Sequence, residues 1–287
     1  RSTIPPHNPL FVGRSEQIRQ ILKALTEAGP SLVALHGLGG MGKSVLAHEY
    51  AHVWAAHYRA GRFLLPAEGR GDLKTLITSL ATDLGLTLTE EERADPDRAH
   101  RRVVAELTQT ARAEGGPALV LLDNVDAPDL LTRSAVSAAL PPRDAVHVIA
   151  TTRLEEKMLE AATCLEVGAL PVSDAARLLD KHRPFAEEDD PAAARTAAEA
   201  IARRLGGYPL AVEVAAVFLR ETPEVQYPGF QARLEREGIG AVEGAGEEGG
   251  VQLSRHPETM VSRLLAPTLE GLSEAEALAV QYAAVLP

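Results

Sequence analysis

The chain has 287 residues, of which 45% are hydrophobic and 24% charged, a composition typical of a globular protein with more than one domain. Its net charge of −11 disfavours direct nucleic-acid binding by this chain, because such binding needs Lys and Arg to neutralise phosphates. No apolar run approaches the roughly 18 residues needed to span a membrane, and the single cysteine, Cys164, excludes an internal disulfide, so we expect a cytoplasmic protein without membrane partners.

The first nine residues, 1–9, are polar and contain three prolines, and we interpret them as a linker from an upstream part of a longer protein. Apolar residues then recur at helical spacing from Ser15 to Ala28, before Gly29 and Pro30. This pattern predicts an amphipathic helix.

Short apolar runs alternate with helical patterns over the next part of the chain. Alternation of this kind indicates a mostly parallel sheet with helices on both faces, which we assign to residues 10–169. The predicted strands are Leu32–Leu35, Arg62–Leu65, Ala118–Leu122, Val146–Ala150 and Cys164–Val167, and the predicted helices between them are Lys43–Tyr58, Asp72–Leu84 and Asp97–Ala113.

No strand pattern recurs after Ser173, so residues 170–237 are predicted to form a small all-helical domain. Asp190 is suited to cap a helix that begins at Pro191, and the Gly206-Gly207 pair is suited to end it. Further helices are expected over Tyr208–Arg220 and near Glu224–Glu237. A flexible loop rich in Gly and Glu follows over 238–255, and residues 256–287 resemble the truncated start of a third domain.

The segment from Gly37 to Ser44 matches G-x-x-x-x-G-K-[ST] and lies between a predicted strand and a predicted helix, as a phosphate-binding P-loop requires. Backbone N–H groups of such a loop surround phosphates, Lys43 contributes positive charge, and the Ser44 hydroxyl is a ligand of Mg²⁺. The phosphate-binding residues are then Gly37, Leu38, Gly39, Gly40, Met41, Gly42, Lys43 and Ser44.

Two further strand ends complete the expected site. The apolar strand that ends in Asp123 is typical of one that supplies a carboxylate to Mg²⁺. The strand that leads into Thr151-Thr152-Arg153 places an arginine where it would sense a γ-phosphate. A surface arginine paired with Glu155 or Glu156 is an equally good interpretation of Arg153 from the residues alone.

A competing motif, H-E-x-x-H, runs from His48 to His52 and on a helix is typical of a zinc site. It falls within the helix that follows the phosphate loop, and the sequence offers no third ligand nearby. We therefore disfavour zinc binding.

With these motifs in hand, the chain resembles the NB-ARC branch of the STAND NTPases, the switch modules of plant resistance proteins, apoptosome-forming factors and many bacterial signalling proteins. The motifs that carry the resemblance are Phe11-Val12-Gly13-Arg14, GLGGMGKS, ALVLLDNVD, HVIATTR and Gly206-Gly207-Tyr208-Pro209-Leu210-Ala211. Together they extend over nearly the whole chain.

The resemblance implies that ADP or ATP with Mg²⁺ is the cofactor. It assigns adenine contacts to Val12, Gly13 and Arg14 and to Pro209, and Val45 and Leu210 are further predicted cofactor-binding residues. It also implies that 256–287 begins a winged-helix domain, and that effector and sensor domains lie outside this chain.

The family also implies a signalling switch that is closed with ADP and opens and forms homo-oligomers with ATP, in defence or stress signalling in bacterial relatives. Many relatives follow the magnesium aspartate with a second acid, whereas this chain has Asn124, so we expect slow hydrolysis at best. Asp126 lies two residues further on and is a candidate replacement. The alternatives are an ordinary turnover ATPase or P-loop kinase, and the nucleotide switch of a STAND-type transcription regulator.

Overall fold

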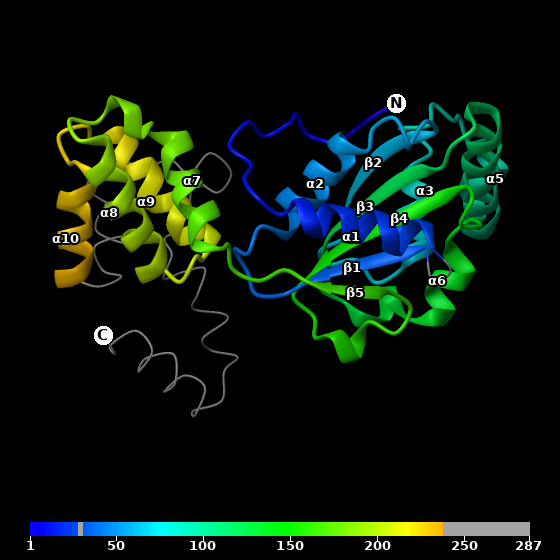
Figure 1. The fold of residues 1–287 in the computed structure, drawn as a ribbon. Coiled ribbons are helices and arrows are strands. Elements are labelled where there is room, and N and C mark those ends of the chain that lie inside the picture. Colours follow the sequence, from blue (N-terminus) through cyan, green and yellow to red (C-terminus); the bar gives the residue numbers. More distant parts are fainter. Residues whose placement is uncertain (28–30, 238–287) are drawn as a thin grey trace. The chain divides into compact units, whose positions relative to one another are not determined.

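The computed structural model describes residues 1–27 and 31–237, and it divides into two compact units (Figure 1). The first unit contains Arg1–Pro9, Arg14–Gly37 and Lys43–Val167. The second contains Leu10–Gly13, Leu38–Gly42 and, of the chain from Gly168, the described residues 168–237. Two short segments from the N-terminal part of the sequence therefore belong to the second unit.

The first unit is built on a parallel sheet, as the sequence predicted. Its strands are β1 (Leu32–His36), β2 (Gly61–Pro66), β3 (Ala118–Val125), β4 (Val146–Thr152) and β5 (Thr163–Glu166). All pairings are parallel, and the strand order is β2-β3-β4-β1-β5. Strand β4 therefore lies between β1, which leads to the phosphate loop, and β3, which carries Asp123.

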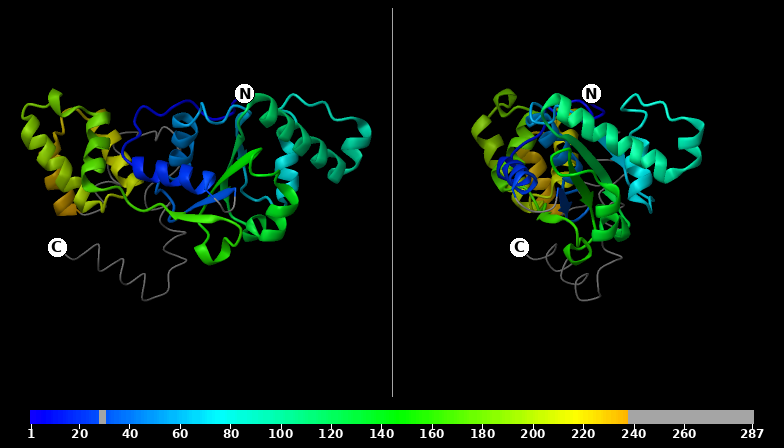
Figure 2. Two further views of the ribbon diagram at one scale, coloured as in Figure 1. Left: turned by 45° about the vertical axis from the view of Figure 1, so that its right-hand side comes forward. Right: turned by 90° about the vertical axis from the view of Figure 1, so that its right-hand side faces the viewer.

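Helices cover both faces of this sheet (Figures 1 and 2). Because side chains alternate along a strand, Leu32 and Ala34 of β1 face one core, where they pack with α3 (Leu73–Ser79) and α5 (Pro96–Glu114). The side chain of His147 on β4 lies on the other face, where its Nδ1 is 3.2 Å from the hydroxyl of Tyr58, in the segment that follows α2. Burial on both faces explains why the strands are almost continuously apolar.

The helices of the first unit differ in length from the sequence expectation. The helix predicted over Lys43–Tyr58 is α2 (Lys43–Val53) and ends early, because the Tyr58 hydroxyl lies buried between Tyr50 and His147, at 2.5 and 3.2 Å. The helix predicted over Asp72–Leu84 is α3, which begins after the Asp72 cap and ends at Ser79. Helices α1 (Ser15–Thr26) and α5 agree with their predicted ranges to within two residues at each end, whereas α4 (Glu90–Ala94) and α6 (Arg133–Ala139) were not predicted.

The N-terminal segment lies along the edge strand β2. Ser2 pairs in parallel with Arg62, the Thr3 N–H donates to the Arg62 carbonyl at 2.9 Å, and the Arg62 N–H donates to the Arg1 carbonyl at 3.1 Å. The Arg1 guanidinium donates to the Leu84 carbonyl at 2.6 Å. The stretch interpreted as a linker therefore covers an edge of the sheet.

The described part of the second unit after Gly168 contains four α-helices: α7 (Val172–His182), α8 (Pro191–Arg204), α9 (Pro209–Glu221) and α10 (Tyr227–Glu237). Asp190 caps α8 by accepting hydrogen bonds from the N–H groups of Ala192 and Ala193. The loop expected over 238–255 and the winged helix expected over 256–287 lie outside the described residues. None of the described helices combines the length and apolar character needed to cross a membrane.

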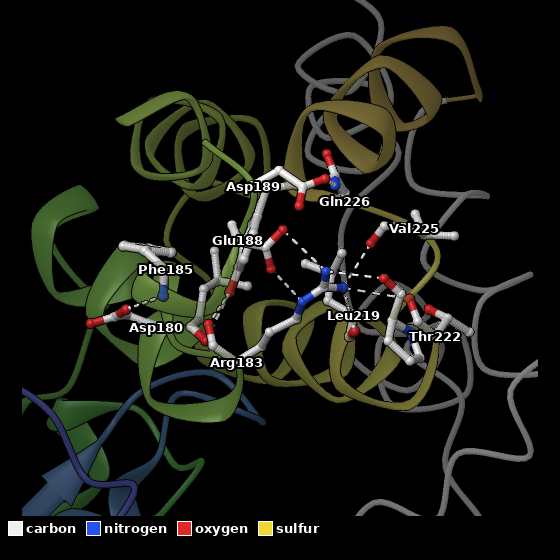
Figure 3. Close-up of polar contacts among 12 residues, drawn as sticks. Asp180, Arg183, Phe185, Glu188, Asp189, Leu219, Thr222, Val225 and Gln226 are labelled. Atoms are coloured by element: carbon white, nitrogen blue, oxygen red, sulfur yellow. Dashed lines mark hydrogen bonds and ion pairs between the residues drawn. The ribbon is translucent and has the colours of Figure 1, made fainter. Parts of the chain in front are cut away.

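Arg183 joins three helices of the second unit (Figure 3). Its guanidinium forms an ion pair with Glu188, whose side chain is 3% exposed, and it donates to carbonyls at the C-terminal end of α9 and beyond, including Leu219 at 2.9 Å and Val225 at 2.8 Å. The Tyr227 hydroxyl at the start of α10 donates to the carbonyl of Arg183 itself at 2.8 Å. One side chain thus satisfies a buried charge and several helix-end carbonyls.

We expect Arg183→Met to destabilise the protein by about 3–5 kcal/mol, because it leaves the Glu188 carboxylate buried without its partner. The measurement is chemical denaturation followed by circular dichroism. The matched control is Arg220→Met, which removes an ion pair to Glu221 in which both side chains are 47% exposed and should change stability by less than about 1 kcal/mol. Equal losses in the two variants would contradict a structural role specific to Arg183.

Candidate functional site

The carboxyl ends of the three central strands meet at one edge of the sheet. In the pairing of β1 with β4, Leu35 lies opposite Thr151, and in the pairing of β3 with β4, Leu122 lies opposite Ala150. The residues that follow, Gly37, Asp123 and Arg153, are therefore neighbours in space although they are far apart in sequence. Parallel sheets place ligand sites at this edge.

The Asp123 carboxylate joins the elements of this edge. One of its oxygens, Oδ1, accepts hydrogen bonds from the Ser44 hydroxyl at 2.6 Å and from the Thr151 hydroxyl at 2.6 Å. Ser44 lies in the first turn of α2 and Thr151 lies on β4, so this carboxylate ties both to β3. The sequence predicted Ser44 and Asp123 but not Thr151, whose only signal was its place beside Arg153.

The Ser44 and Asp123 oxygens suit Mg²⁺. This ion prefers hard oxygen ligands at about 2.0–2.1 Å in octahedral geometry, so adjacent ligands are about 2.9 Å apart. The two oxygens here are 2.6 Å apart. If they moved apart by a few tenths of an ångström, both could bind one ion. The donor set therefore fits the predicted role of this pair.

Lys43 is 8% exposed, and its ammonium donates to the Gly37 carbonyl at 2.8 Å. Burial and, to a smaller extent, the positive charge of Arg153 lower the pKa of Lys43, and the negative charge of Asp123 opposes them, so that the pKa is about 8. Burial disfavours the charged form of a lysine. An anion at this position would stabilise its charged form.

Arg153 is exposed and lies close enough to Lys43 to affect its pKa. Glu155 forms an ion pair with Lys157 at 2.5 Å, and within the described chain no ion pair joins Arg153 to Glu155 or Glu156. The geometry therefore favours the interpretation of Arg153 as a group near the phosphate loop over that of a paired surface arginine.

Asn124 has a left-handed backbone conformation, with φ 60°, at a point where the pairing of β3 and β4 shifts register. Asparagine tolerates this conformation better than most residues, and the Asn124 N–H donates to the Thr151 hydroxyl oxygen at 2.9 Å. Asp126, the candidate replacement acid, accepts two contacts from the Gly69 N–H at 3.0 and 3.1 Å. Its carboxylate is thus used to hold a turn.

Gly37 is required by packing as well as by conformation. Its φ is 139°, and a Cβ there would lie 2.7 Å from the carbonyl oxygen of Val167, where the chain leaves β5. The Val167 N–H donates to the His36 carbonyl at 2.8 Å, which fixes that approach. Only glycine fits this first position of the loop.

The middle of the phosphate loop, Leu38–Gly42, belongs to the second unit. The Tyr208 hydroxyl donates to the Gly39 carbonyl at 2.6 Å, and a Cβ at Gly40 would lie 2.4 Å from that hydroxyl and 3.1 Å from Cβ of Leu210. The sequence placed Tyr208 in a motif but gave it no role. Pro209 takes the first position of α9, as its fixed φ favours, and is half-buried beside Tyr208.

The predicted adenine-contact segment is divided between the units. Val12 is 6% exposed in the core of the second unit, and the Lys181 ammonium donates to the carbonyl of its neighbour Phe11 at 2.8 Å. A Cβ at Gly13 would lie 2.2 Å from the Asp174 carboxylate. Arg14 belongs to the first unit, where it directly precedes α1 with φ 58°.

The rest of the predicted loop contacts vary in exposure. Leu38 is 53% exposed, whereas Met41 and Val45 are half-buried.

Two residues of H-E-x-x-H, Glu49 and His52, contact the N-terminal segment. A ring nitrogen of His52 lies 2.8 Å from the Pro5 carbonyl, and the Glu49 carboxylate lies 3.1 Å from His7. In residues 1–27 and 31–237, no group of three or more His, Cys, Asp or Glu is arranged to hold a metal ion. The contacts give these residues a packing role.

Comparison with known proteins places this geometry in context. The family described as "AAA ATPase domain" matches residues 10–151. Regulatory protein AfsR of Streptomyces coelicolor is 28% identical over 219 residues, which are 72% of this chain and 20% of that protein. A nucleotide-binding leucine-rich repeat (NLR)-like protein of Hyaloscypha variabilis is 26% identical over 237 residues, 75% of this chain and 22% of its own length. The chain spans about a fifth of these relatives.

Solved structures with related folds include Drosophila ORC bound to DNA, with TM-score 0.50 and 16% identity over 94% of this chain and 77% of that one. A STAND protein with a tetratricopeptide repeat sensor from Pyrococcus horikoshii gives TM-score 0.49 and 17% identity over 96% of this chain and 35% of that one. The first likeness supports the fold, a parallel sheet followed by helices.

We expect Gly37→Ala to destabilise the protein by about 3 kcal/mol or more, because it combines a forbidden φ with a clash against a backbone carbonyl. The matched control is Gly69→Ala, where φ is 66° and the space for a Cβ is open, and where the cost should be about 1–2 kcal/mol. Thermal unfolding of both variants gives the comparison. A Gly37→Ala protein as stable as the control would show that the chain near Val167 can move aside.

Proposed function

We propose that this chain is a P-loop NTPase of the STAND class and acts as an adenine-nucleotide switch: a closed form holds ADP, and exchange for ATP opens it and allows homo-oligomers to form. The nucleotide acts as a ligand with unequal affinity for two conformations, which is the only way in which a ligand shifts their balance.

The observation that carries this proposal is the group of Lys43, Ser44 and Asp123 at the strand ends of the first unit. Lys43 is 8% exposed, and the Ser44 hydroxyl donates to Asp123 at 2.6 Å. A phosphate at this group would meet a buried positive charge and two oxygens suited to Mg²⁺. Loss or exchange of the nucleotide would change the charge that these residues face, and a switch requires such a difference between nucleotide states.

The residues support distinct roles toward the nucleotide. Ser44 and Asp123 supply oxygen ligands suited to Mg²⁺, which would neutralise phosphate charge when bound. Lys43 supplies a buried positive charge beside the loop. Arg153, exposed and close to Lys43, is the group we assign to sensing a γ-phosphate, and this contact would distinguish ATP from ADP.

Turnover is expected to be slow. Asn124 cannot accept a proton at neutral pH, and the Asp126 carboxylate accepts hydrogen bonds from the Gly69 N–H. A general base that activates water must be within reach of it, and neither residue offers a free carboxylate next to Asp123. An ordinary ATPase or kinase is therefore the weaker candidate.

The role of the whole protein follows from the relatives only as a proposal. Two of them are named regulatory proteins, from Streptomyces coelicolor and Streptomyces griseus, and one is named NLR-like. We infer that this chain regulates attached effector and sensor domains. Control of transcription is one function that such regulation would serve. The net charge of −11 disfavours DNA contact by the chain itself.

The first test is the nucleotide content of the protein as purified, released by heat and identified by chromatography. We expect about one ADP per chain in the wild type and none in Lys43→Ala, which removes the buried ammonium beside the loop. The control is Lys157→Ala, whose ammonium is 72% exposed in an ion pair with Glu155 and which should keep its ADP. An empty wild type that hydrolyses added ATP rapidly would favour the turnover enzyme.

The lowered pKa of Lys43 predicts a pH dependence of binding. The free protein loses this proton as pH rises through about 8, whereas a bound phosphate keeps the lysine charged. Nucleotide affinity should then be highest below pH 8 and should fall about tenfold from pH 7 to pH 9. At the higher pH, binding should also be accompanied by the uptake of a proton.

Isothermal titration calorimetry in buffers of different ionisation enthalpy measures both effects. Lys43→Arg is the control, because an arginine stays charged throughout this range and should bind with little pH dependence. A wild type whose affinity is the same at pH 7 and pH 9 would contradict the lowered pKa.

A further inference from the structure

The Tyr208 hydroxyl makes a contact that the motif containing it does not explain. It donates to the carbonyl of Gly39 in the middle of the phosphate loop at 2.6 Å, across 169 residues of sequence. Its ring end lies against Gly40, since a Cβ there would be 2.9 Å from the ring carbon that bears the hydroxyl. The loop therefore rests directly on this side chain.

This contact sets the direction of one backbone N–H. The described chain has no cis peptide bonds, and in a trans peptide the C=O and the following N–H point in opposite directions. Because the Gly39 carbonyl is turned toward Tyr208, the Gly40 N–H is turned away from it. Within the described residues, no acceptor for the Gly40 N–H is found, so this donor is free to bind a ligand.

Tyr208 is itself held in place by its neighbours in the second unit. Its N–H donates to the Leu205 carbonyl at 3.1 Å, and its carbonyl accepts from the Val212 N–H at 3.0 Å at the start of α9. The preceding Gly207 has a backbone carbonyl that accepts from the Leu170 N–H at 2.8 Å, and a Cβ on it would lie 2.0 Å from the Leu170 carbonyl oxygen. The hydroxyl is thus presented from a fixed backbone.

We propose that Tyr208 is a positioning residue for nucleotide binding: its hydroxyl holds the Gly39-Gly40 peptide so that the Gly40 N–H faces the phosphates. The inference rests on the proposed nucleotide function and adds to it a residue outside the phosphate motif. Without the hydroxyl, the peptide is free to rotate, and binding then includes the cost of ordering it. Because a P-loop backbone surrounds the α- and β-phosphates, ADP and ATP should depend on Tyr208 equally.

The test is Tyr208→Phe, which removes the hydroxyl and keeps the ring against Gly40. We expect the affinities for ADP and ATP, measured by calorimetry on protein stripped of nucleotide, to fall by about threefold to tenfold, the usual worth of one hydrogen bond. The melting temperature of the nucleotide-free variant should stay within about 2 °C of the wild type, because Tyr208 is only half-buried.

The matched control is Tyr227→Phe, which removes another hydroxyl of the same unit. That hydroxyl donates to the carbonyls of Leu179 and Arg183 at 3.1 and 2.8 Å, in a side chain that is fully buried. This variant should lose stability and keep the wild-type affinity. Tyr208→Phe is thus expected to lower affinity and keep stability, whereas Tyr227→Phe is expected to lower stability and keep affinity. This contrast distinguishes positioning of the loop from a general weakening of the helical unit.

Each outcome is decisive. If the wild type binds ADP and Tyr208→Phe binds it equally well, the positioning role is wrong while the nucleotide function stands. An effect on ATP alone would assign the contact to the γ-phosphate and overturn the orientation argued above. If the wild type binds neither nucleotide, the proposed function fails and this inference fails with it.

Discussion

The site depends on one carboxylate, that of Asp123, which lies where three parallel strands end. By accepting hydrogen bonds from Ser44 and Thr151, it ties the first turn of α2 and the end of β4 to β3. These three elements meet because all strands of a parallel sheet have their carboxyl ends at the same edge. Because β4 lies between β1 and β3, the Thr151 hydroxyl at its end also reaches this carboxylate.

Local sequence patterns predicted the five strands, the helical second unit and the phosphate motif, because each depends on residues close in sequence. Contacts between distant segments were not predictable in this way. The end of α2 at Val53 depends on Tyr58 meeting His147, and the cover on β2 depends on residues 1–3. Tyr208 stood within a recognisable motif, but its hydrogen bond to Gly39 spans 169 positions. No periodicity within a window of that motif could reveal it.

The glycines of the phosphate loop illustrate how a binding motif is also a folding motif. Gly37 is required by the approach of the Val167 carbonyl, and Gly40 by the approach of the Tyr208 hydroxyl. Both constraints exist before any phosphate is present. A phosphate-binding loop thus gains order from the contacts that its carbonyls and Cα atoms make with the rest of the protein.

The cover on β2 has a consequence for the solubility of the chain. A parallel sheet has two edges, and an uncovered edge offers a row of unpaired N–H and C=O groups to any other extended chain. Here the N-terminal residues Arg1–Thr3 occupy part of the β2 edge. A shortened chain that begins after Pro9 would keep every residue of the phosphate loop yet expose that edge to strand addition. Its first failure would then be aggregation through the sheet, with the nucleotide site still intact.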